Sequence, residues 1–433
     1  MNKTKPLETA HTGLSETEVA ARVDALLAQM SLVEKIGQLN QVGGADFAPG
    51  PKAEGQIRVG GAGSVLWVND SKRFNELQKI AVEESPSGIP LLFALDVIHG
   101  YRTIFPVPLA MASSWDPAVP ERAQTVAARE ARAAGIHWTF GPMLDICRDA
   151  RWGRIVEGAG EDPYLGSAMA VAQVRGFQGD DIADPERVLA CAKHFAGYGA
   201  SDGGRDYDPV YLSETQLRNI HMPPFKAAID AGVATFMGAY MDLNDVPASG
   251  SRFLLRQVLR EEWGFVGFVV SDAFAIGNMI IQHHARDGRD AALRALKAGM
   301  NMDMSSYTYS QNLAGLVDDG TVSVAEIEEM VRPILAAKVK MGLFEQPYVD
   351  EKLLAEVIAR PEHRQTARWV AQRSMVLLKN EDGLLPLSKD LNCVAVIGPV
   401  ANSKEATEGS WMVFSHAAAA ATVLEGIRAK EYG

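Results

Sequence analysis

Short apolar runs alternate along the chain with longer segments whose apolar residues recur at helical spacing. The apolar runs predict buried strands at residues 62–68, 89–97, 136–146, 188–197, 234–240, 265–270 and 300–304. The helical patterns cover residues 71–84, 116–134, 163–179, 213–232, 252–263, 286–299, 308–319 and 323–341. Roughly seven or eight such alternations in about 280 residues are typical of a (β/α) barrel of the TIM type. We therefore predict an α/β fold in which residues 1–342 form a barrel domain.

A doubly wound parallel sheet would show the same alternation of strands and helices. That fold binds dinucleotides through a G-x-G-x-x-G turn that follows its first strand and opens a helix. The glycines of "GGAGSV" (60–65) precede a strand instead. They therefore predict no phosphate site, and the barrel is favoured.

The pattern changes after residue 342. Residues 343–373 contain two prolines and mixed charge, and we interpret them as a linker. Apolar runs at 374–380 and 393–399 predict strands, so residues 374–433 are interpreted as the first part of an α/β sandwich domain. A single buried strand with its helix has unpaired edges and uncovered faces. We therefore expect this second domain to be incomplete in this chain.

The composition argues against two classes of partner, nucleic acid and membranes. A net charge of −12 and a pI near 5.3 argue against nucleic acid, and no apolar run is long enough to span a membrane. The three cysteines show no C-x-x-C spacing and predict no disulfide framework. The first residues contain no apolar signal-peptide region. That fits a cytoplasmic protein or the mature form of a periplasmic one, and both the location and a homo-oligomeric state are left open.

Charged side chains gather where the predicted strands end. Asp96 ends the run 89–97, Lys193 and His194 lie inside an otherwise apolar run, and Asp272 directly follows the run 265–270. Barrels place their active sites at the carboxyl ends of the strands. This clustering therefore favours a catalytic site.

Each of these residues also has a structural interpretation. Asp96 and Asp272 could cap the helices that follow them, and Lys193 and His194 could be a buried ion pair and a hydrogen-bonded core histidine. The arginines between 148 and 154 could neutralise the acidic residues around them. Taken together, however, these interpretations would leave many unpaired charges around one rim. The mixture of side chains, without a Walker loop or an H-E-x-x-H motif, suits a neutral ligand rich in hydroxyl groups.

Longer motifs make the chain comparable with a known family. They are "MSLVEKIGQL", "LDVIHGYRTIFPVPLAMASSWDP", "DARWGR", "KHFAGYG", "GFVVSD" and "MVLLKNEDGLLPL". In these motifs the chain resembles glycoside hydrolase family 3 over nearly its whole length, and it is especially similar to the bacterial two-domain β-glucosidases. The resemblance implies a (β/α) barrel followed by an α/β sandwich, and retaining hydrolysis of β-glucosides from the non-reducing end. We expect no cofactor and no metal.

The resemblance also assigns roles to residues. It implies that Asp272 is the nucleophile and forms a covalent glycosyl-enzyme. It implies that a further set of residues binds the sugar: Asp96, Arg154, Lys193 and His194 in the −1 subsite, with Arg102, Arg205, Met237 and Tyr240 around it.

The chain departs from the family pattern in ways that affect these expectations. The loop after K-H-F reads "AGYGASDGGRD", without the histidine of single-domain N-acetylglucosaminidases, which favours the two-domain branch. Ala150 replaces a usual proline. Ala273 stands where many relatives have Trp or His, which leaves the aglycone preference open.

The acid/base glutamate of two-domain relatives has no counterpart in this sequence. We expect it on a C-terminal segment absent from this chain, which is either a second polypeptide from a cut chain or a further region of the same polypeptide. The expected partners are that segment and a β-glucoside or oligosaccharide, with neither nucleic acid nor membrane. A sugar-binding or catalytically impaired relative and a glycoside phosphorylase remain as alternatives.

Overall fold

The computed structural model describes residues 13–44, 52–358, 360–412, 414 and 417–431. Residues 1–12 lie outside these described residues. The expectation of no signal peptide rests partly on them. The predicted α/β class with a parallel sheet is confirmed. No helix in the described ranges is long and apolar enough to cross a bilayer.

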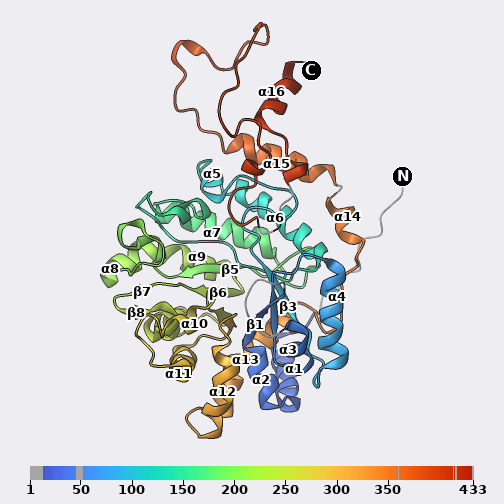
Figure 1. Ribbon diagram of the computed structural model, residues 1–433, viewed down its shortest axis with the longest axis vertical. Coiled ribbons are helices and arrows are strands. Elements are labelled where there is room, and N and C mark those ends of the chain that lie inside the picture. The colour runs from blue at the N-terminus through green and yellow to red at the C-terminus, as the bar shows by residue number, and fades with distance from the viewer. Residues whose placement is uncertain (1–12, 45–51, 359, 413, 415–416, 432–433) are drawn as a thin grey trace.

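Short parallel strands form the centre of the molecule, and helices surround them (Figure 1). Five strands make one sheet in the order β10-β1-β2-β3-β4, and three make a second sheet in the order β5-β6-β9. Parallel bridges between Trp138 and Leu189 and between Val270 and Met302 link the edges of the two sheets. The strands are β1 (Asn40–Gly43), β2 (Ser64–Leu66), β3 (Leu92–Leu95), β4 (Trp138–Thr139), β5 (Cys191–Phe195), β6 (Thr235–Gly238), β9 (Phe268–Val270) and β10 (Asp303–Met304).

Burial on both faces explains why the strand sequences are continuously apolar. Every residue of β2, β3, β5, β6 and β9 is buried. Trp138 is fully buried, packs edge-on against Phe140 and Phe268 at ring distances of 4.8 and 4.9 Å, and donates its indole N–H to Thr235 at 2.8 Å. A strand with two buried faces needs apolar residues at every position rather than at alternate ones.

The helices agree closely with the predicted ranges. Ser15 and Ser31 form capping boxes with Glu18 and Glu34, which fixes the starts of the first two helices. The helices of this body are α1 (Glu16–Gln29), α2 (Leu32–Gln38), α3 (Ala53–Arg58), α4 (Ser71–Lys79), α5 (Pro108–Ala112), α6 (Ala118–Ala134), α7 (Pro163–Gln178), α8 (Glu214–Gln216), α9 (Pro223–Asp230), α10 (Ala275–Asn278), α11 (Gly288–Ala298), α12 (Thr308–Asp318) and α13 (Val324–Lys340), with π-helical turns at Ile80–Glu84, Leu217–His221 and Phe253–Glu262. An antiparallel hairpin, β7 (Asp242–Leu243) with β8 (Val246–Pro247), was not predicted.

The segment interpreted as a linker lies against the body of the molecule. It contains α14 (Leu353–Ile358) and α15 (Pro361–Arg373), and both helices pack on α6. His363 on α15 lies 2.8 Å from the carboxylate of Glu130 on α6, and both side chains are fully buried. This buried contact ties the segment to the body.

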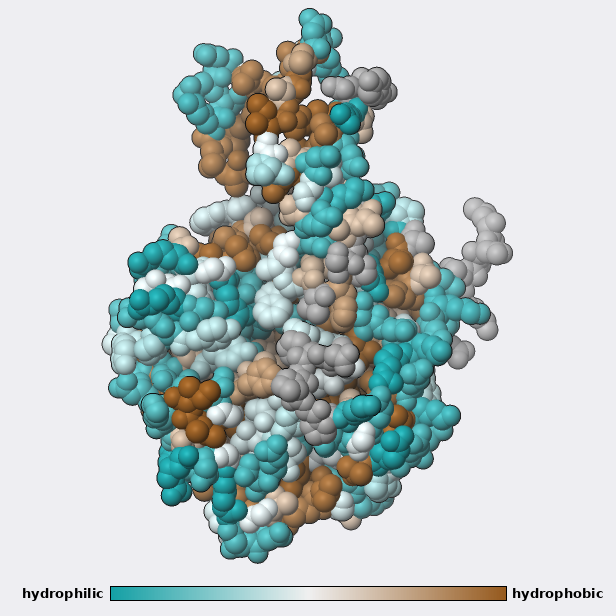
Figure 2. All heavy atoms as spheres, in the orientation of Figure 1, coloured by the Kyte–Doolittle hydropathy of each residue, from teal (hydrophilic) through white to brown (hydrophobic). Residues whose placement is uncertain are grey.

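The prediction of strands at 374–380 and 393–399 is wrong. None of these residues is in a strand, and Leu378 and Ile397 are 91% and 90% exposed. Figure 1 shows this stretch as long loops above the body, and Figure 2 shows hydrophobic atoms gathered there. An apolar run becomes a parallel strand only when neighbouring strands take its hydrogen bonds and helices cover its faces, and the described residues supply neither. The helix predicted near the end of the chain is present as α16 (Val423–Glu431).

Candidate active site

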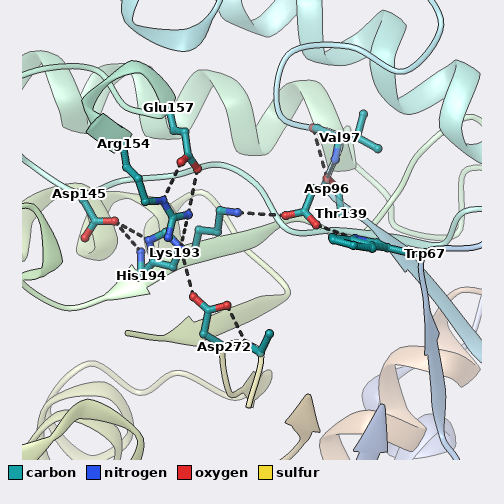
Figure 3. Close-up of polar contacts among 11 residues, drawn as sticks. Trp67, Asp96, Val97, Thr139, Asp145, Arg154, Glu157, Lys193, His194 and Asp272 are labelled. Carbon is teal, nitrogen blue, oxygen red and sulfur yellow. Dashed lines mark hydrogen bonds and ion pairs between the residues drawn. The ribbon is translucent and has the colours of Figure 1, made fainter. Parts of the chain in front are cut away.

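The carboxyl ends of several strands meet at a cavity of about 480 Å³. Most of the residues that the sequence singled out line it: Asp96, Arg154, Lys193, Met237, Tyr240 and Asp272. They arrive from different strands and from the loop that follows β4, and Figure 3 shows the charged ones converging. The clustering predicted from the strand ends is therefore present in three dimensions.

Asp272 follows β9 and is buried, with 8% of its surface exposed. Its Oδ1 accepts a hydrogen bond from the amide of Ala273 at 2.8 Å. Its Oδ2 is also buried and has no hydrogen-bond donor among the described residues. The residue does not cap a helix, since the N-cap of α10 is Phe274. One carboxylate oxygen is thus left without a donor at the cavity wall.

Burial raises the pKa of Asp272 to about 6, and the positive charges of Arg154 and Lys193 limit the rise. The carboxyl group is therefore mostly ionised at neutral pH. A carboxylate that is poorly solvated and bonded on one side only has the electronic character of a nucleophile.

Arg154 is held in a fixed orientation by Glu157. Its Nε and Nη2 donate to the two carboxylate oxygens at 2.7 and 3.0 Å. Burial opposes charge on this guanidinium, but the bidentate bond to Glu157 outweighs it and raises the pKa of Arg154. The ion pair suggested by the sequence exists, and the same arginine also lines the cavity. The two interpretations are compatible.

His194 is a neutral acceptor beneath Arg154. Burial, aided by the charges of Arg154 and Lys193, lowers its pKa well below the usual value. Arg154 Nη2 donates to Nε2 at 3.0 Å, so the ring proton sits on Nδ1 and is donated to Asp145 at 2.7 Å. The 3.5 Å approach of Nε2 to Asp272 is therefore not an ion pair. His194 thus helps to position Arg154, which lies near Asp272.

Lys193 and Asp96 form a second buried pair across the cavity floor. Lys193 Nζ donates to Asp96 Oδ1 at 3.1 Å, and Trp67 donates its indole N–H to Asp96 Oδ2 at 3.0 Å. The side chains of the pair are only 2% and 7% exposed. Buried pairs of this kind present fixed donors and acceptors to a ligand.

Part of the C-terminal segment completes the cavity wall. The ring of Trp411 lies 4.7 Å from Lys193 Nζ and 5.6 Å from the guanidinium of Arg154. The neighbouring carbonyl of Ser410 lies 2.8 Å from Nε2 of His99. Trp411 thus joins residues of the body although it follows them by more than two hundred positions in the sequence.

Three predicted sugar-binding residues do not line the cavity: His194, which contacts Arg154 from outside the lining, and Arg102 and Arg205. Arg205 bonds Asp208 at 2.6 Å, and its side chain is 69% exposed. Arg102 is half-buried beside the Tyr101 ring, 5.0 Å from its centroid, and is not among the residues that line the cavity. Arg102 lies in a motif that resembles the family, and Arg205 lies in the loop after K-H-F, but local loop geometry directs both side chains elsewhere.

Sequence reasoning did not assign several residues that line the cavity: Trp67, Glu157, Asp206, Tyr207, Phe274 and Trp411. Glu157 and Phe274 lie close to residues that were singled out, so their proximity was a usable signal. Trp411 carried none, because it reaches the cavity only through tertiary contact. No group of three or more potential metal ligands occurs within the described part of the chain.

Comparison with known proteins agrees with this geometry. The family model described as the Glycosyl hydrolase family 3 N terminal domain matches residues 31–337, and the Glycosyl hydrolase family 3 C-terminal domain matches residues 375–431. The chain belongs to glycosyl hydrolase family 3. The second match covers the segment interpreted as the start of a second domain, and the incompleteness of that domain in this family 3 chain stays a prediction.

Individual relatives of this family 3 protein carry glycosidase names. The chain is 41% identical over 413 residues to the periplasmic beta-glucosidase of Salmonella typhimurium, with 94% of this chain and 54% of that protein covered. It is 33% identical to a beta-xylosidase of Formosa agariphila, covering 96% and 56% of the two. It is similar to the structure of a beta-glucosidase from Listeria innocua in complex with glucose, with a TM-score of 0.89, 36% identity, and 95% and 58% covered. The chain spans about half the length of the curated relatives it matches.

Proposed function

We propose that this chain carries the glycone-binding and nucleophilic half of a retaining exo-acting β-glucosidase. The observation that carries the proposal is the geometry of Asp272, a buried carboxylate with one oxygen left without a donor at the wall of a charged cavity. The family and the beta-glucosidase names of its relatives support glycoside hydrolysis. The linked strands support a closed (β/α) barrel that bears the site at its carboxyl end.

In the first step, an oxygen of Asp272 attacks the anomeric carbon of a terminal β-glucosyl residue. The glycosidic bond breaks, the aglycone leaves as an alcohol with a proton from the acid/base carboxyl, and a covalent glycosyl ester forms on Asp272. Arg154 and Lys193 keep the carboxylate largely ionised. Water then attacks the same carbon, gives one proton to the acid/base carboxylate, and releases glucose and the free carboxylate of Asp272.

The floor of the cavity binds the sugar ring in this proposal. Asp96 accepts hydroxyl hydrogen bonds, and Arg154 and Lys193 donate them. Because these groups are already held by Glu157, His194 and one another, little side-chain entropy is lost when the sugar binds. Arg102 and Arg205 do not line the cavity, so the proposal gives them no role in the −1 subsite.

The acid/base carboxyl is proposed to come from a C-terminal segment absent from this chain. A retaining glycosidase needs a second carboxyl group about 5–5.5 Å from the nucleophile. Among the described residues, the other carboxylates that line the cavity are already engaged: Asp96 with Lys193, Glu157 with Arg154, and Asp206 with the indole of Trp152 at 2.9 Å. Each of these is placed as an acceptor rather than as a proton donor.

Trapping of the glycosyl-enzyme tests the nucleophile. The chain is treated with 2-deoxy-2-fluoro-β-glucosyl fluoride, and its intact mass and peptides are measured. We expect one fluoroglucosyl adduct, located on the peptide that contains Asp272. Asp272→Asn should abolish it, whereas Asp242→Asn, at a half-buried strand carboxylate outside the cavity, should keep it. An adduct elsewhere, or none, would refute the assignment.

Leaving-group dependence and azide test the missing acid/base. Dinitrophenyl β-glucoside should react, while methyl β-glucoside should be hydrolysed poorly, because only the alkoxide needs a proton to leave. Azide should accelerate turnover of the dinitrophenyl glucoside and yield β-glucosyl azide, since it attacks the anomeric carbon without base assistance. Equal rates for both glucosides and no azide effect would show that the chain holds its own acid/base.

A sugar-binding or catalytically impaired protein is the second candidate. It is favoured by the single unengaged carboxylate in the described cavity, since binding needs the floor but not a second carboxyl group. Glucose binding by calorimetry, without any adduct from the fluorinated reagent, would support it over the enzyme.

A further inference from the structure

A second cavity, of about 430 Å³, lies apart from the one at Asp272 and shares no lining residue with it. Its walls come from the turn after the hairpin β7–β8, from the start of the helix Phe253–Glu262 and from α11. The hairpin and α11 lie at the same side of the molecule, and α11 packs against the turn (Figure 1). A cavity of this volume has the size of a small-molecule site.

The lining of this cavity carries positive charge. It includes Arg252, Arg294 and Lys297 together with the ring of His284, and none of its described residues is an Asp or a Glu. The side chain of Arg252 makes no ion pair or hydrogen bond with any described residue. Because the whole chain has a net charge of −12, a concave surface lined only by cations is unusual for it. We call this surface the basic cavity.

Ion pairs neutralise the charge of the basic cavity only in part. Arg294 Nε lies 3.1 Å from Asp290, and Lys297 pairs with Glu326. Asp290 is also 3.3 Å from Nε of Arg286, so two guanidinium groups share its single charge. When the arginine without a partner is included, four cations accompany two carboxylates. An excess of positive charge therefore remains for a ligand.

The start of the helix Phe253–Glu262 adds uncharged donors. Ser251, Arg252 and Phe253 line the basic cavity, and the first amides of a helix have no partner within the helix and form the positive end of its dipole. Ser251 is only 6% exposed. Its Oγ accepts from the amide of Leu254 at 3.3 Å and donates its own proton to no described residue. A buried hydroxyl with a free proton beside a helix start suits an oxyanion.

His284 supplies a further donor. Burial first, and then the charge of Arg294, lower the pKa of His284, so the ring is neutral at pH 7 and keeps one N–H. Neither ring nitrogen makes a hydrogen bond with a described residue. The ring lies close to the backbone of Gly250, where an added Cβ would meet its Nε2 at 3.2 Å. Glycine at this position thus leaves room for the ring at the cavity wall.

The remaining wall of the basic cavity is apolar, formed by Val246, Phe253 and Leu293. A small ion would fill the cationic part and leave this wall uncovered. The number of donors exceeds what the two oxygens of a carboxylate use, whereas a phosphate monoester has three acceptor oxygens and close to two charges. A phosphate group that carries an organic substituent therefore matches both parts of the lining.

We propose that the basic cavity binds an organic phosphate monoester. The phosphate group lies among Arg252, Arg294 and Lys297, at the start of the helix. The organic substituent packs on the ring of Phe253. This binding site is separate from the proposed nucleophile and does not depend on the proposed function.

Calorimetric titration of the chain at pH 7.5, in a phosphate-free buffer of low ionic strength, tests the site. The probes are phenyl phosphate and inorganic phosphate. We expect one phenyl phosphate per chain, bound about three- to tenfold more tightly than inorganic phosphate because its ring contacts Phe253. The affinity should fall as salt is added, since the cations are partly exposed. Equal affinities for the two probes would overturn the organic part of the proposal and assign the site to inorganic phosphate.

Arg252→Gln should weaken the binding of both probes by about fivefold or more, because a charge-assisted contact is lost. Arg252→Lys, which keeps the charge, should retain most of the affinity. Phe253→Leu should remove the preference for phenyl phosphate and leave the affinity for inorganic phosphate unchanged. The melting temperature of both Arg252 variants should equal that of the parent chain, since the side chain is exposed and bonds no described residue.

Arg175→Gln is the matched control. Arg175 on α7 is also an exposed arginine without an ion pair or hydrogen bond to any described residue, and it lines neither cavity. The substitution removes the same charge and should leave the affinity unchanged. Absence of binding by both probes, unchanged affinity in Arg252→Gln, or equal losses in Arg252→Gln and Arg175→Gln would overturn the site. Arg252→Gln should still form the fluoroglucosyl adduct on Asp272 at the parent rate, so failure of this site and failure of the proposed function are observed separately.

Discussion

Two opposing effects act on the charge of Asp272. Burial disfavours its charge and raises its pKa to about 6, while Arg154 and Lys193 favour the charge. The chain thereby keeps an ionised carboxylate in a place where water solvates it poorly. Reactivity is gained and stability is lost by the same placement.

The pH dependence of glycosyl-enzyme formation should report this pKa. Only the ionised carboxylate attacks, and protonation removes the nucleophile as the pH falls through about 6. We expect the second-order rate constant for the fluorinated glucosyl fluoride to be level above pH 7 and to fall about tenfold per unit well below pH 6. A rate constant that stays level down to pH 4.5 would contradict the raised pKa.

Replacement of Asp272 should stabilise the folded chain. The folded pKa of about 6 lies above the ordinary value of 3.8, so the folded state binds the proton more tightly than the unfolded state does. The wild-type carboxyl therefore destabilises the fold at pH 7, by on the order of 3 kcal/mol, and this effect disappears as the pH falls below about 4. Asp272→Asn should raise the melting temperature by several degrees at pH 7 and by little at pH 4.

Asp290→Asn is the control, and its expected effect on folding stability has the opposite sign. Asp290 is exposed to the same extent as Asp272, 8%, and accepts hydrogen bonds from Arg286. Burial tends to raise its pKa, but the bonds from Arg286 and Arg294 outweigh that and lower it. Its replacement should therefore reduce stability at pH 7. A stabilising effect of both substitutions would show that the gain at Asp272 is not electrostatic.

At the scale of elements, the helices and the inner strands could be predicted from the sequence, because their patterns are local. The capping boxes and the continuous apolar runs specify a helix start and a doubly buried strand within a few residues. The run 393–399 has the same local pattern as β5 or β9, but a parallel strand also needs neighbours that take its hydrogen bonds. The sequence pattern does not report whether those neighbours are present.

The same distinction separates the site residues that were predicted from those that were missed. Asp96, Lys193 and Asp272 lie at or within strands, so barrel geometry alone brings them to one face. Trp411 lies in irregular structure, and only its contacts with Lys193 and Arg154 reveal it. Arg205 lies in a loop whose local ion pair with Asp208 directs the side chain outward, which no periodicity could show.

Limited proteolysis should distinguish the segment 375–400 from the helices before it. Its apolar residues are exposed and no strand holds its backbone, so local opening costs little. Brief chymotrypsin treatment should cleave near Leu377, Leu378 and Leu384, while α15 and the preceding body stay intact. Mass spectrometry of the fragments identifies the sites. First cleavage within α6 or α15 would show that the segment is better protected than its exposure indicates.

At the scale of the whole molecule, apolar surface is distributed unevenly. The body buries its apolar residues in one large core and a smaller cluster between α6 and α15, whereas Met375, Leu378 and Ile397 are 75%, 91% and 90% exposed on the C-terminal segment. A large exposed apolar patch is uncommon on a soluble monomer and promotes association. The chain therefore carries one well-packed part and one part whose apolar side chains lack cover within the described residues.

The dye ANS should bind to this segment. We expect strong ANS fluorescence from the native chain, and the double substitution of Leu378→Asp with Ile397→Asp should reduce it by about half or more while the melting temperature of the body stays the same. Val266→Asp, at an 85% exposed apolar residue on the body, is the control and should have little effect. Unchanged fluorescence in the double variant would place the exposed apolar surface elsewhere.

The wall formed by Trp411 has a consequence for the order in which the cavity assembles. His99 and Ser410 are separated by 311 positions, and Lys193 and Asp96 by 97. Contacts between such distant positions form late, because the chain loses the entropy of a long loop before it gains the contact. During refolding, the helices and the charged floor should therefore precede the aromatic wall. For that interval the proposed nucleophile would be in place while the cavity still lacked the wall that Trp411 forms.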